Sequence, residues 1–273
     1  MDRTYVVTGA ASGIGAATAK WLAERGGRVI TSDLHDADVI ADLATPAGRQ
    51  ALADGAAKLS GGRVDGVVAN AGGGPPETSL SLNFYGAVAT LEGLRPVLAK
   101  SPSPRAIAVS SIASLRPWAA DITEACLTLP EAEANATARR KWESGQASGG
   151  VGANALPDGV QFGLDLYGAA KQALQRWCRK AAPSTAWGGA GIALNVVALG
   201  FYDTPAAAYV LTNPEARDAM EKLASLKGSF PGRAEEAAAL LAWLVSPENS
   251  QMTGQILFAD GGFECQATQG GAA

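Results

Sequence analysis

Short apolar runs and amphipathic stretches alternate along most of this chain. Runs rich in β-branched residues, which are typical of buried strands, cover residues 5–7, 28–32, 64–69, 106–110, 192–198 and 255–259. Stretches with apolar residues at helical spacing lie between them, at residues 16–25, 80–99, 166–180 and 234–245. Parallel strands need helical crossovers of this kind, and apolar runs without alternation indicate a sheet that helices cover on both faces. The pattern predicts an α/β fold, with a doubly wound parallel sheet in three α/β/α layers that forms a single domain over residues 1–273.

Two segments interrupt this alternation. Residues 116–163 form a long insertion that holds a capping-box pattern, Thr128 with Glu131, followed by acidic and then basic residues. We expect a helix that begins near Thr128 and ends at a glycine cap, Gly145. Residues 204–232 are rich in apolar side chains but are broken by three prolines, and we expect them to form a short helical flap.

Composition excludes several classes of protein. The 273 residues are 47% hydrophobic and 18% charged, which fits a globular unit with a sizeable core. With 22 basic and 26 acidic residues the formal net charge is −4, so no basic field would hold a nucleic acid. No apolar run approaches the roughly 20 residues of a membrane span, and no signal-peptide pattern opens the chain. We therefore expect a cytoplasmic protein with neither a nucleic-acid nor a membrane partner.

The cysteines and the histidine do not form a pattern typical of metal ligands. Cys126, Cys178 and Cys265 lie far apart, so they indicate neither a disulfide framework nor a metal site, and we expect all three to be buried thiols. His35 is the single histidine, and we expect its ring to lie at the surface in solvent. No metal ion is expected.

The segment TGAASGIG, Thr8–Gly15, falls between the first strand and the first helix. Glycines there let the backbone turn tightly and approach a phosphate, and the start of the helix presents free N–H groups. Asp33 ends the second strand, twenty residues after Gly13, where a carboxylate can bind the hydroxyls of an adenosine ribose. The same carboxylate would repel a 2′-phosphate, and Ser12 and Leu34 carry no charge to attract one. These residues favour NAD over NADP. Two alternatives stay open: the glycine turn binds no ligand, or Asp33 is an acid in solvent at the end of its strand.

Further motifs, together with this turn, resemble the short-chain dehydrogenase/reductase family over nearly the whole chain. The turn has the spacing TGxxxGIG, and Tyr167 and Lys171 form a Tyr-x-x-x-Lys pair. The other matching motifs are Asn70-Ala71-Gly72, Asn83 in LNFYG, Ser111 in VSSIAS, the segment NVVALGFYDT at 195–204 and Asp260-Gly261-Gly262. Within the family, the segment SDLHDADVIADLATPAGR and the long insertion resemble the bacterial 3α-hydroxysteroid dehydrogenases/carbonyl reductases.

The resemblance implies a Rossmann-type fold, NAD as the cofactor and a set of site residues. The implied catalytic residues are Asn83, Ser111, Tyr167 and Lys171. The implied cofactor-binding residues are Gly9, Ser12, Gly13, Ile14, Gly15, Asp33, Asp42, Leu43, Asn70, Ala71, Gly72, Tyr167, Lys171, Gly200 and Thr204. Family members are usually homo-oligomers, so a homodimer or a homotetramer is expected.

Two features depart from the family pattern. Leu199 precedes Gly200 where the family usually has proline, so φ is no longer fixed at that position. Between Ser111 and Tyr167 lies a stretch far longer than is usual, and a helix in it would obstruct one common subunit interface. This obstruction favours the dimer.

The residue types suit hydride transfer between a nicotinamide and an alcohol carbon. The hydroxyl proton must leave, and bringing a phenol from a pKa of about 10 to about 7 requires roughly 4 kcal/mol. A lysine one helical turn away, at about 4 Å, contributes a similar amount at an effective dielectric of 20. Tyr167 is therefore expected to be the base. The resemblance implies that Ser111 holds the substrate oxygen by a hydrogen bond, and that Asn83 supports a relay of water molecules behind Lys171.

The substrate is expected to be a hydrophobic secondary alcohol or ketone, and a cyclic one, whether steroid, terpenoid or aromatic. Two interpretations of the apolar side chains of the flap and of Trp118 and Trp142 stay open: they line a cleft at the carboxyl ends of the strands, or they pack against the protein itself. A non-catalytic NAD(H)-binding sensor is a second function class, which the complete set of reacting residues disfavours. A sugar-nucleotide epimerase or dehydratase-like enzyme is a third, but its glycine spacing is usually TGxxGxxG.

Overall fold

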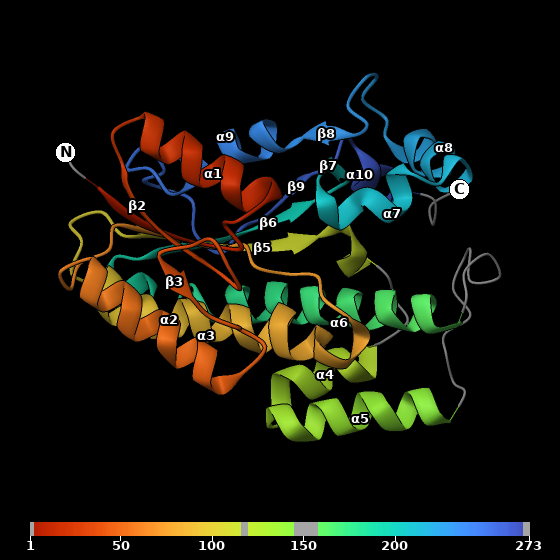
Figure 1. Ribbon diagram of the computed structural model, residues 1–273, viewed down its shortest axis with the longest axis horizontal. Coiled ribbons are helices and arrows are strands. Elements are labelled where there is room, and N and C mark those ends of the chain that lie inside the picture. Colours follow the sequence, from red (N-terminus) through yellow and green to blue (C-terminus); the bar gives the residue numbers. More distant parts are fainter. Residues whose placement is uncertain (1–2, 116–119, 145–157, 270–273) are drawn as a thin grey trace.

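The computed structural model describes residues 3–115, 120–144 and 158–269 (Figure 1). Within these residues a seven-stranded parallel sheet has the strand order β3-β2-β1-β4-β5-β6-β9. The strands are β1 (Thr4–Thr8), β2 (Arg28–Asp33), β3 (Val39–Ile40), β4 (Gly66–Ala69), β5 (Arg105–Ser111), β6 (Ala193–Leu199) and β9 (Ile256–Ala259). The chain runs outward from β1 in one direction and from β4 in the other, so the predicted doubly wound, Rossmann-type sheet is confirmed.

Helices cover both faces of this sheet (Figure 1). One face carries α1 (Gly13–Glu24) and α9 (Ala234–Leu244), and the other carries α2 (Pro46–Leu59), α3 (Ala87–Leu98) and α6 (Asp158–Ala181). Neighbouring strand residues belong to different cores: Val6 packs with α2, α3 and α6, whereas Val7 packs with α1 and α9. Because successive side chains point to opposite faces and both faces are buried, the strands read as continuous apolar runs.

The described part of the insertion forms two helices, where the sequence predicted one. α4 (Ala120–Thr128) packs against α6, and α5 (Glu131–Glu143) lies beside α4, farther from the sheet (Figure 1). The predicted capping box is wrong. Thr128 is the last residue of α4, where its hydroxyl donates to the Glu124 carbonyl, and Pro130 precedes α5 instead. The predicted cap Gly145 lies outside the described residues.

The flap is helical, as predicted. It contains a 3₁₀ turn (Pro205–Ala207), α7 (Ala208–Leu211) and α8 (Pro214–Leu223). A two-stranded parallel sheet, which was not predicted, joins its two ends: β7 (Tyr202–Asp203) pairs with β8 (Gly232–Arg233). α10 (Phe263–Gln269) was not predicted either, and it lies near α8 and the small sheet (Figure 1).

Several short turns complete the chain. A π-helical turn (Ser81–Gly86) leads into α3, so the helix predicted from residue 80 begins with a wider coil. Short 3₁₀ turns lie at Pro76–Thr78, Ile112–Leu115 and Gly188–Ala190. Of the described helices, none combines the length and the apolarity needed to cross a membrane.

The burial of the three cysteines and of the histidine was predicted from residue type alone, and the structure confirms it for only some of them. Cys126 and Cys178 are buried as predicted, and burial raises the pKa of Cys126 to about 12. Cys265 is exposed, which contradicts the prediction, because residues 265–268 of α10 face solvent. The side chain of His35 is 71% exposed, as predicted, and its ring lies 3.1 Å from a carboxylate oxygen of Asp36.

Candidate active site

The glycine turn after β1 is shaped by close backbone contact. Gly9 and Gly13 have φ values of 67° and 52°, which glycine adopts without strain. A Cβ on Gly15 would lie 1.9 Å from the Gly9 carbonyl oxygen, so α1 can approach the turn only with glycine there. The side chain of Ser12, just before α1, makes no capping hydrogen bond, and the first turn holds no acidic residue. The N–H groups at the start of α1 are therefore available to an anion.

Asn70 holds this turn against the end of β4. Its Nδ2 donates to the Thr8 carbonyl at 3.0 Å, and the Thr8 hydroxyl accepts from the N–H groups of Asn70 and Ala71, each at 3.0 Å. The glycine turn and the segment Asn70-Ala71-Gly72 are thus hydrogen-bonded to each other. They lie where the chain leaves the neighbouring strands β1 and β4 in opposite directions along the sheet. Sheets of this kind bind ligands at such a switch point. Thr8 was not predicted to take part.

Asp33 lies at the same edge, at the end of β2. Its Oδ2 accepts from the Ala11 N–H at 2.9 Å and its Oδ1 from the Leu34 N–H at 2.7 Å. Each carboxylate oxygen can accept about two hydrogen bonds, so each keeps one lone pair. That arrangement leaves room for a pair of neighbouring hydroxyls, as on a ribose.

Asp42 and Leu43 follow β3, whose end is level with Asp33 because the Ala41 N–H donates to the Asp33 carbonyl at 2.8 Å. Asp42 is exposed, and its Oδ1 accepts from the Ala44 N–H at 2.9 Å. Leu43 is only 4% exposed and packs in the core below α2 and α3. The buried Leu43 side chain therefore anchors this loop to the core. Only the Leu43 backbone lies at the sheet edge, near Asp33.

Asn83 and Lys171 meet behind Gly72. Asn83 is fully buried in the π-helical turn; its Nδ2 donates to the carbonyls of Gly73 and Ser79, and its Oδ1 accepts from the Gly73 N–H, all at 2.9 Å. A Cβ on Gly72 would lie 2.9 Å from the Asn83 Oδ1 and 3.1 Å from the Lys171 Nζ. The structure thus brings two predicted catalytic side chains to one predicted cofactor turn.

Lys171 carries its ammonium group inside the protein. The residue is 2% exposed, and its Nζ donates to the Val109 carbonyl at 2.8 Å. Burial lowers the pKa of Lys171 to about 8, because removal from water disfavours the charged form. The Nζ lies 5.5 Å from the ring centroid of Tyr167, within the range of a cation–π contact. Tyr167 itself is partly buried, one turn earlier on α6.

Ser111 ends β5, at the same edge. Its Oγ accepts from the Ala113 N–H at 3.1 Å. Ser114 closes the short loop that follows, since its hydroxyl donates to the Ser111 carbonyl at 2.7 Å.

Gln175 fixes that loop from α6, and it was not predicted as a site residue. Its Nε2 donates to the hydroxyls of Ser110, at 3.0 Å, and Ser114, at 2.7 Å. It lies one turn beyond Lys171, which is itself one turn beyond Tyr167, so the three share a face of α6. That repeated spacing of four is the signal in the sequence that could have identified it.

Gly200 and Thr204 complete the predicted set. A Cβ on Gly200 would lie 2.7 Å from the Asp260 Cα, so the chain after β6 passes close to the chain after β9. Leu199, in place of the usual proline, lets β6 pair through this position, with Ser111 on one side and Ala259 on the other. The Thr204 Cγ2 would lie 3.2 Å from a Cβ on Gly13, so the flap begins against the glycine turn.

A cavity of about 220 Å³ lies under the flap. Its wall includes Met220, Leu226 and Phe230 of the flap and Ile112, which directly follows Ser111. Trp142 packs elsewhere, against Phe162 with ring centroids 4.5 Å apart, and Trp118 lies outside the described residues. Of the apolar side chains considered above, those of the flap line a cavity, whereas Trp142 packs against the protein itself.

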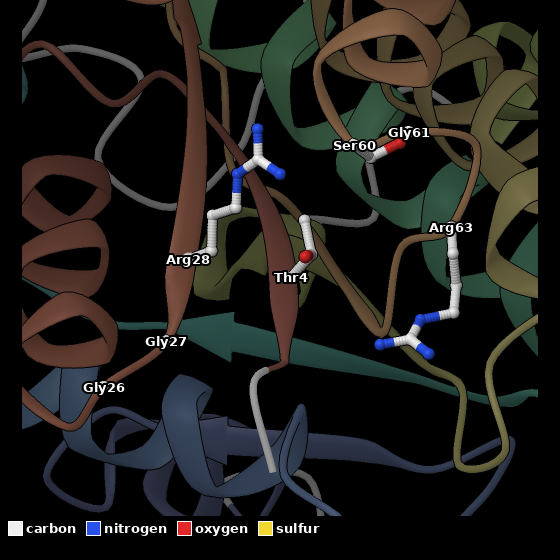
Figure 2. A pocket seen from close by; sticks show the side chains of 7 residues that line it. All are labelled: Thr4, Gly26, Gly27, Arg28, Ser60, Gly61 and Arg63. Atoms are coloured by element: carbon white, nitrogen blue, oxygen red, sulfur yellow. The ribbon is translucent and has the colours of Figure 1, made fainter.

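A larger, open cavity of about 730 Å³ lies at the opposite edge, where β1 and β2 begin (Figure 2). Its polar side chains include Thr4, Arg28 and Arg63. The Arg28 guanidinium donates to the Leu59 carbonyl at 2.5 Å, and that of Arg63 lies 3.7 Å from a carboxylate oxygen of Asp65. This edge holds none of the predicted site residues. In the part of the chain that the structure describes, no group of three or more histidine, cysteine or acidic side chains could hold a metal ion.

Known proteins resemble this chain over nearly its whole length. The short chain dehydrogenase family matches residues 3–123, and the Enoyl-(Acyl carrier protein) reductase family matches residues 157–264. The chain is 38% identical to the 3-alpha-hydroxysteroid dehydrogenase/carbonyl reductase of Comamonas testosteroni, over 95% of both proteins. It is 32% identical to the cis-4-hydroxycyclohexanecarboxylate dehydrogenase of Sinomonas cyclohexanicum, over 96% of both.

The fold agrees as well. The 3-alpha-hydroxysteroid dehydrogenase of Pseudomonas sp. B-0831, whose crystal structure is complexed with NADH, superposes with a TM-score of 0.82 at 32% identity, over 96% of this chain and 97% of that one. The resemblance predicted from the glycine turn and the Tyr-x-x-x-Lys pair is confirmed. The chain belongs to the short-chain dehydrogenase/reductase family, as an oxidoreductase related to hydroxysteroid and hydroxycyclohexanecarboxylate dehydrogenases.

Proposed function

We propose that this protein oxidises a hydrophobic, cyclic secondary alcohol, or reduces the corresponding ketone, with NAD as its cofactor and Tyr167 as its acid or base. The observation that carries the proposal is the buried ammonium of Lys171, held by the Val109 carbonyl against the ring of Tyr167. This pair lies beside Asn83 and at the edge of the sheet that carries the glycine turn. When bound, the nicotinamide cofactor supplies the hydride acceptor or donor.

The described residues fit a dinucleotide. The open amino terminus of α1, which Gly15 allows to approach the turn, would face the pyrophosphate. The lone pairs left on Asp33 would accept from the adenosine ribose hydroxyls, and its negative charge would repel a 2′-phosphate, which supports NAD over NADP. We assign to the same site the remaining predicted positions, which are Gly9, Ser12, Gly13, Ile14, Asp42, Leu43, Asn70, Ala71, Gly72, Tyr167, Lys171, Gly200 and Thr204.

The charge of Lys171 is large enough to matter for Tyr167. At 5.5 Å, the distance from its Nζ to the ring centroid, a unit charge favours a phenolate by about 3 kcal/mol at an effective dielectric of 20. In oxidation, the phenolate oxygen of Tyr167 would accept the proton of the substrate hydroxyl, while the Ser111 hydroxyl holds the same substrate oxygen. In reduction the proton would return from Tyr167.

Asn83 would act behind this pair. Its side-chain amide is already hydrogen-bonded to Gly73 and Ser79, so it holds the backbone next to Lys171. The water relay expected from the family stays a prediction, and the Ser79 and Gly73 carbonyls beside Asn83 are the groups that would accept from such a water.

The cavity under the flap has a mostly apolar lining, with Glu236 and Asp260 among its polar residues, and it supports a hydrophobic substrate. Phe201 and Phe230 pack edge to face there with ring centroids 6.1 Å apart, and Ile112, which also lines the cavity, directly follows Ser111. The Comamonas and Sinomonas relatives are named for a hydroxysteroid and a hydroxycyclohexanecarboxylate, and both names place a hydroxyl on a ring. A cyclic secondary alcohol fits both observations.

For assembly we propose a homodimer rather than a homotetramer. α4 packs on α6, and α5 reaches the π-helical turn before α3, so the insertion covers helices that would otherwise be open on this side of the sheet (Figure 1). The cytoplasmic location and the lack of a nucleic-acid partner stay predictions from the sequence.

The purified protein, given a panel of alcohols with either cofactor, should reduce NAD⁺ with ring-bearing apolar alcohols, as followed by the absorbance of the reduced nicotinamide. Because Asp33 repels a 2′-phosphate, kcat/KM should be at least about tenfold higher with NAD⁺ than with NADP⁺. A preference for small polar alcohols, or for NADP⁺, would contradict the proposal. Cofactor binding without turnover across the panel would support the sensor instead.

Replacement of the proposed base, Tyr167→Phe, should lower kcat at least about a hundredfold, because it removes the proton acceptor. The dissociation constant for NADH should change by less than about twofold, since the variant keeps the ring near Lys171. Tyr5→Phe is the matched control, because it removes the hydroxyl of a buried tyrosine that pairs with Arg3 at the opposite edge of the sheet. Equal turnover in both variants would exclude Tyr167 from the mechanism.

Lys171→Met should abolish turnover and yet stabilise the cofactor-free protein at pH 7. The shift of the Lys171 pKa from 10.5 to about 8 is a penalty of about 3 kcal/mol on burying the ammonium. The lost hydrogen bond from this charged donor to the buried Val109 carbonyl offsets about 2 kcal/mol of the gain. The free energy of unfolding in urea should therefore rise by about 1 kcal/mol.

The effect should depend on pH. The penalty is complete below pH 8 and fades between about pH 8 and 10.5, where the folded protein has already released the proton that the unfolded chain still binds. The stability difference between Lys171→Met and the parent should shrink over that range. Lys180→Met, at the exposed end of α6, is the control and should change stability by less than about 0.5 kcal/mol. A destabilised Lys171→Met variant at pH 7 would refute the burial argument.

Light scattering on the purified protein should give the mass of a dimer. A compact tetramer would contradict the proposed obstruction by α4 and α5.

A further inference from the structure

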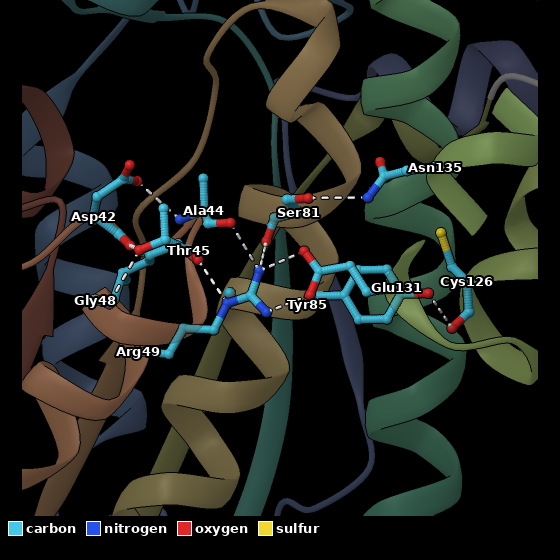
Figure 3. A network of polar contacts seen from close by, with 12 residues as sticks. Asp42, Ala44, Thr45, Gly48, Arg49, Ser81, Tyr85, Cys126, Glu131 and Asn135 are labelled. Atoms are coloured by element: carbon cyan, nitrogen blue, oxygen red, sulfur yellow. Dashed lines mark hydrogen bonds and ion pairs between the residues drawn. The ribbon is translucent and has the colours of Figure 1, made fainter. Parts of the chain in front are cut away.

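Arg49, on α2, joins three parts of the chain that the proposed function does not otherwise connect (Figure 3). Its Nε donates to the Leu43 carbonyl at 2.8 Å, and its Nη2 donates to the Ser81 carbonyl at 2.8 Å and, through a shared hydrogen, to the Ala44 carbonyl at 3.2 Å. Both terminal nitrogens donate to the carboxylate of Glu131, the first residue of α5 in the insertion, at 2.5 and 2.8 Å. One guanidinium thus binds a carboxylate and three backbone carbonyls.

This ion pair is largely out of water. The side chains of Arg49 and Glu131 are 11% and 25% exposed. Burial alone would raise the pKa of Glu131, but hydrogen bonds from Arg49 and Ser81 lower it below its usual value. Glu131 is therefore ionised at neutral pH, and it neutralises the charge of Arg49 in a place where water cannot do so.

Two of the carbonyls lie at the proposed adenosine end of the cofactor site. Leu43 and Ala44 follow β3, whose end is hydrogen-bonded to Asp33 through Ala41. Among the residues that the structure describes, no strand flanks β3 on its outer side, so this loop lacks a neighbour in the sheet to hold it. Arg49 supplies the missing constraint, because a planar guanidinium fixes several acceptors in one geometry.

The third carbonyl belongs to Ser81, which begins the π-helical turn that carries Asn83. The insertion adds contacts of its own here: the Asn135 Nδ2 donates to the Ser81 hydroxyl at 3.1 Å, and the Tyr85 hydroxyl donates to the Leu129 carbonyl at 3.1 Å. The ends of α2, α5 and the π-helical turn therefore meet at the Arg49 guanidinium (Figure 3).

We propose that Arg49 is a positioning residue of the cofactor site, and that Glu131 makes the insertion part of that site by holding Arg49 on the Leu43 and Ala44 carbonyls. The inference rests on the proposed NAD site and assigns to the insertion a role in binding the adenosine end. Without the carboxylate, the Arg49 guanidinium would lose its only described counter-ion contact, and the loop would have more conformational freedom to lose on binding.

The test is cofactor binding by Glu131→Gln, measured by calorimetry on the purified full chain with NADH and with ADP-ribose, which lacks the nicotinamide. The substitution keeps the shape of Glu131 and removes its charge. We expect both dissociation constants to rise by about tenfold, because hydrogen bonds to a charged group are weakened. In turnover, KM for NAD⁺ should rise by a similar factor, while kcat at saturating NAD⁺ changes by less than about twofold.

Glu133→Gln is the matched control. It makes the same change two residues along α5, on an exposed side chain in the same first turn, and it should leave both dissociation constants unchanged. Arg49→Lys is the second variant. It keeps a positive charge next to Glu131, but a lysine cannot bind all the acceptors that the guanidinium binds, so the dissociation constants for NADH and ADP-ribose should both rise. This variant decides the question if Glu131→Gln folds poorly.

The outcomes separate the two proposals. If the parent binds neither NADH nor ADP-ribose, the proposed cofactor site itself is wrong. If the parent binds both but Glu131→Gln and Arg49→Lys bind them as tightly as Glu133→Gln does, the NAD site stands and the positioning role of Arg49 is overturned. An unchanged dissociation constant for ADP-ribose, beside a weakened one for NADH, also overturns it, because the loop would then not act on the adenosine end.

Discussion

A charged lysine buried at the carboxyl edge of the sheet is the constraint around which the proposed site is built. An ammonium group removed from water is stable only where a fixed acceptor receives it, and here the Val109 carbonyl of β5 does so. That contact determines where α6 must run, and with it the positions of Tyr167 and Gln175 on the same helical face. The unfavourable burial that lowers the pKa of Lys171 is also what keeps its charge unscreened next to the phenol. The residue thus illustrates how a proposed catalytic group can lower the stability of the fold that holds it.

Glycines at the carboxyl edge of the sheet allow the close backbone contacts that the site needs. Gly15 lets α1 touch the turn after β1, and Gly72 lets the backbone pass beside Asn83 and Lys171. A methyl group at Gly15 would push α1 away from the turn that precedes it, and one at Gly72 would push the backbone away from the Asn83 and Lys171 side chains. The same edge gathers Asp33 and Ser111 because parallel strands all end on one side. The proposed reacting groups and the proposed cofactor groups therefore lie at one edge of the sheet for a topological reason.

The sheet and its covering helices could be predicted because apolar runs and helical periodicity are local signals. Candidate site residues could be proposed because their motifs are local as well, and the structure brings three of them, Asn83, Lys171 and Gly72, together. Other features depend on contacts between distant segments, which no local pattern carries. Glu131 resembled half of a capping box with Thr128, whereas its carboxylate is held by Arg49 on α2. In the same way, the exposure of Cys265 depends on how α10 packs, not on the habit of its residue type.

The small sheet of β7 and β8 has a consequence for ligand entry. Because Tyr202 pairs with Gly232 and Asp203 with Arg233, the chain between them is a loop whose two ends are hydrogen-bonded to each other. The entropy lost on bringing those ends together is therefore spent during folding rather than on association with substrate. The flap also contacts the segment after β9, where the Leu226 N–H donates to the Gly261 carbonyl at 2.9 Å, so the wall that would receive a bulky ring is ordered by the fold itself.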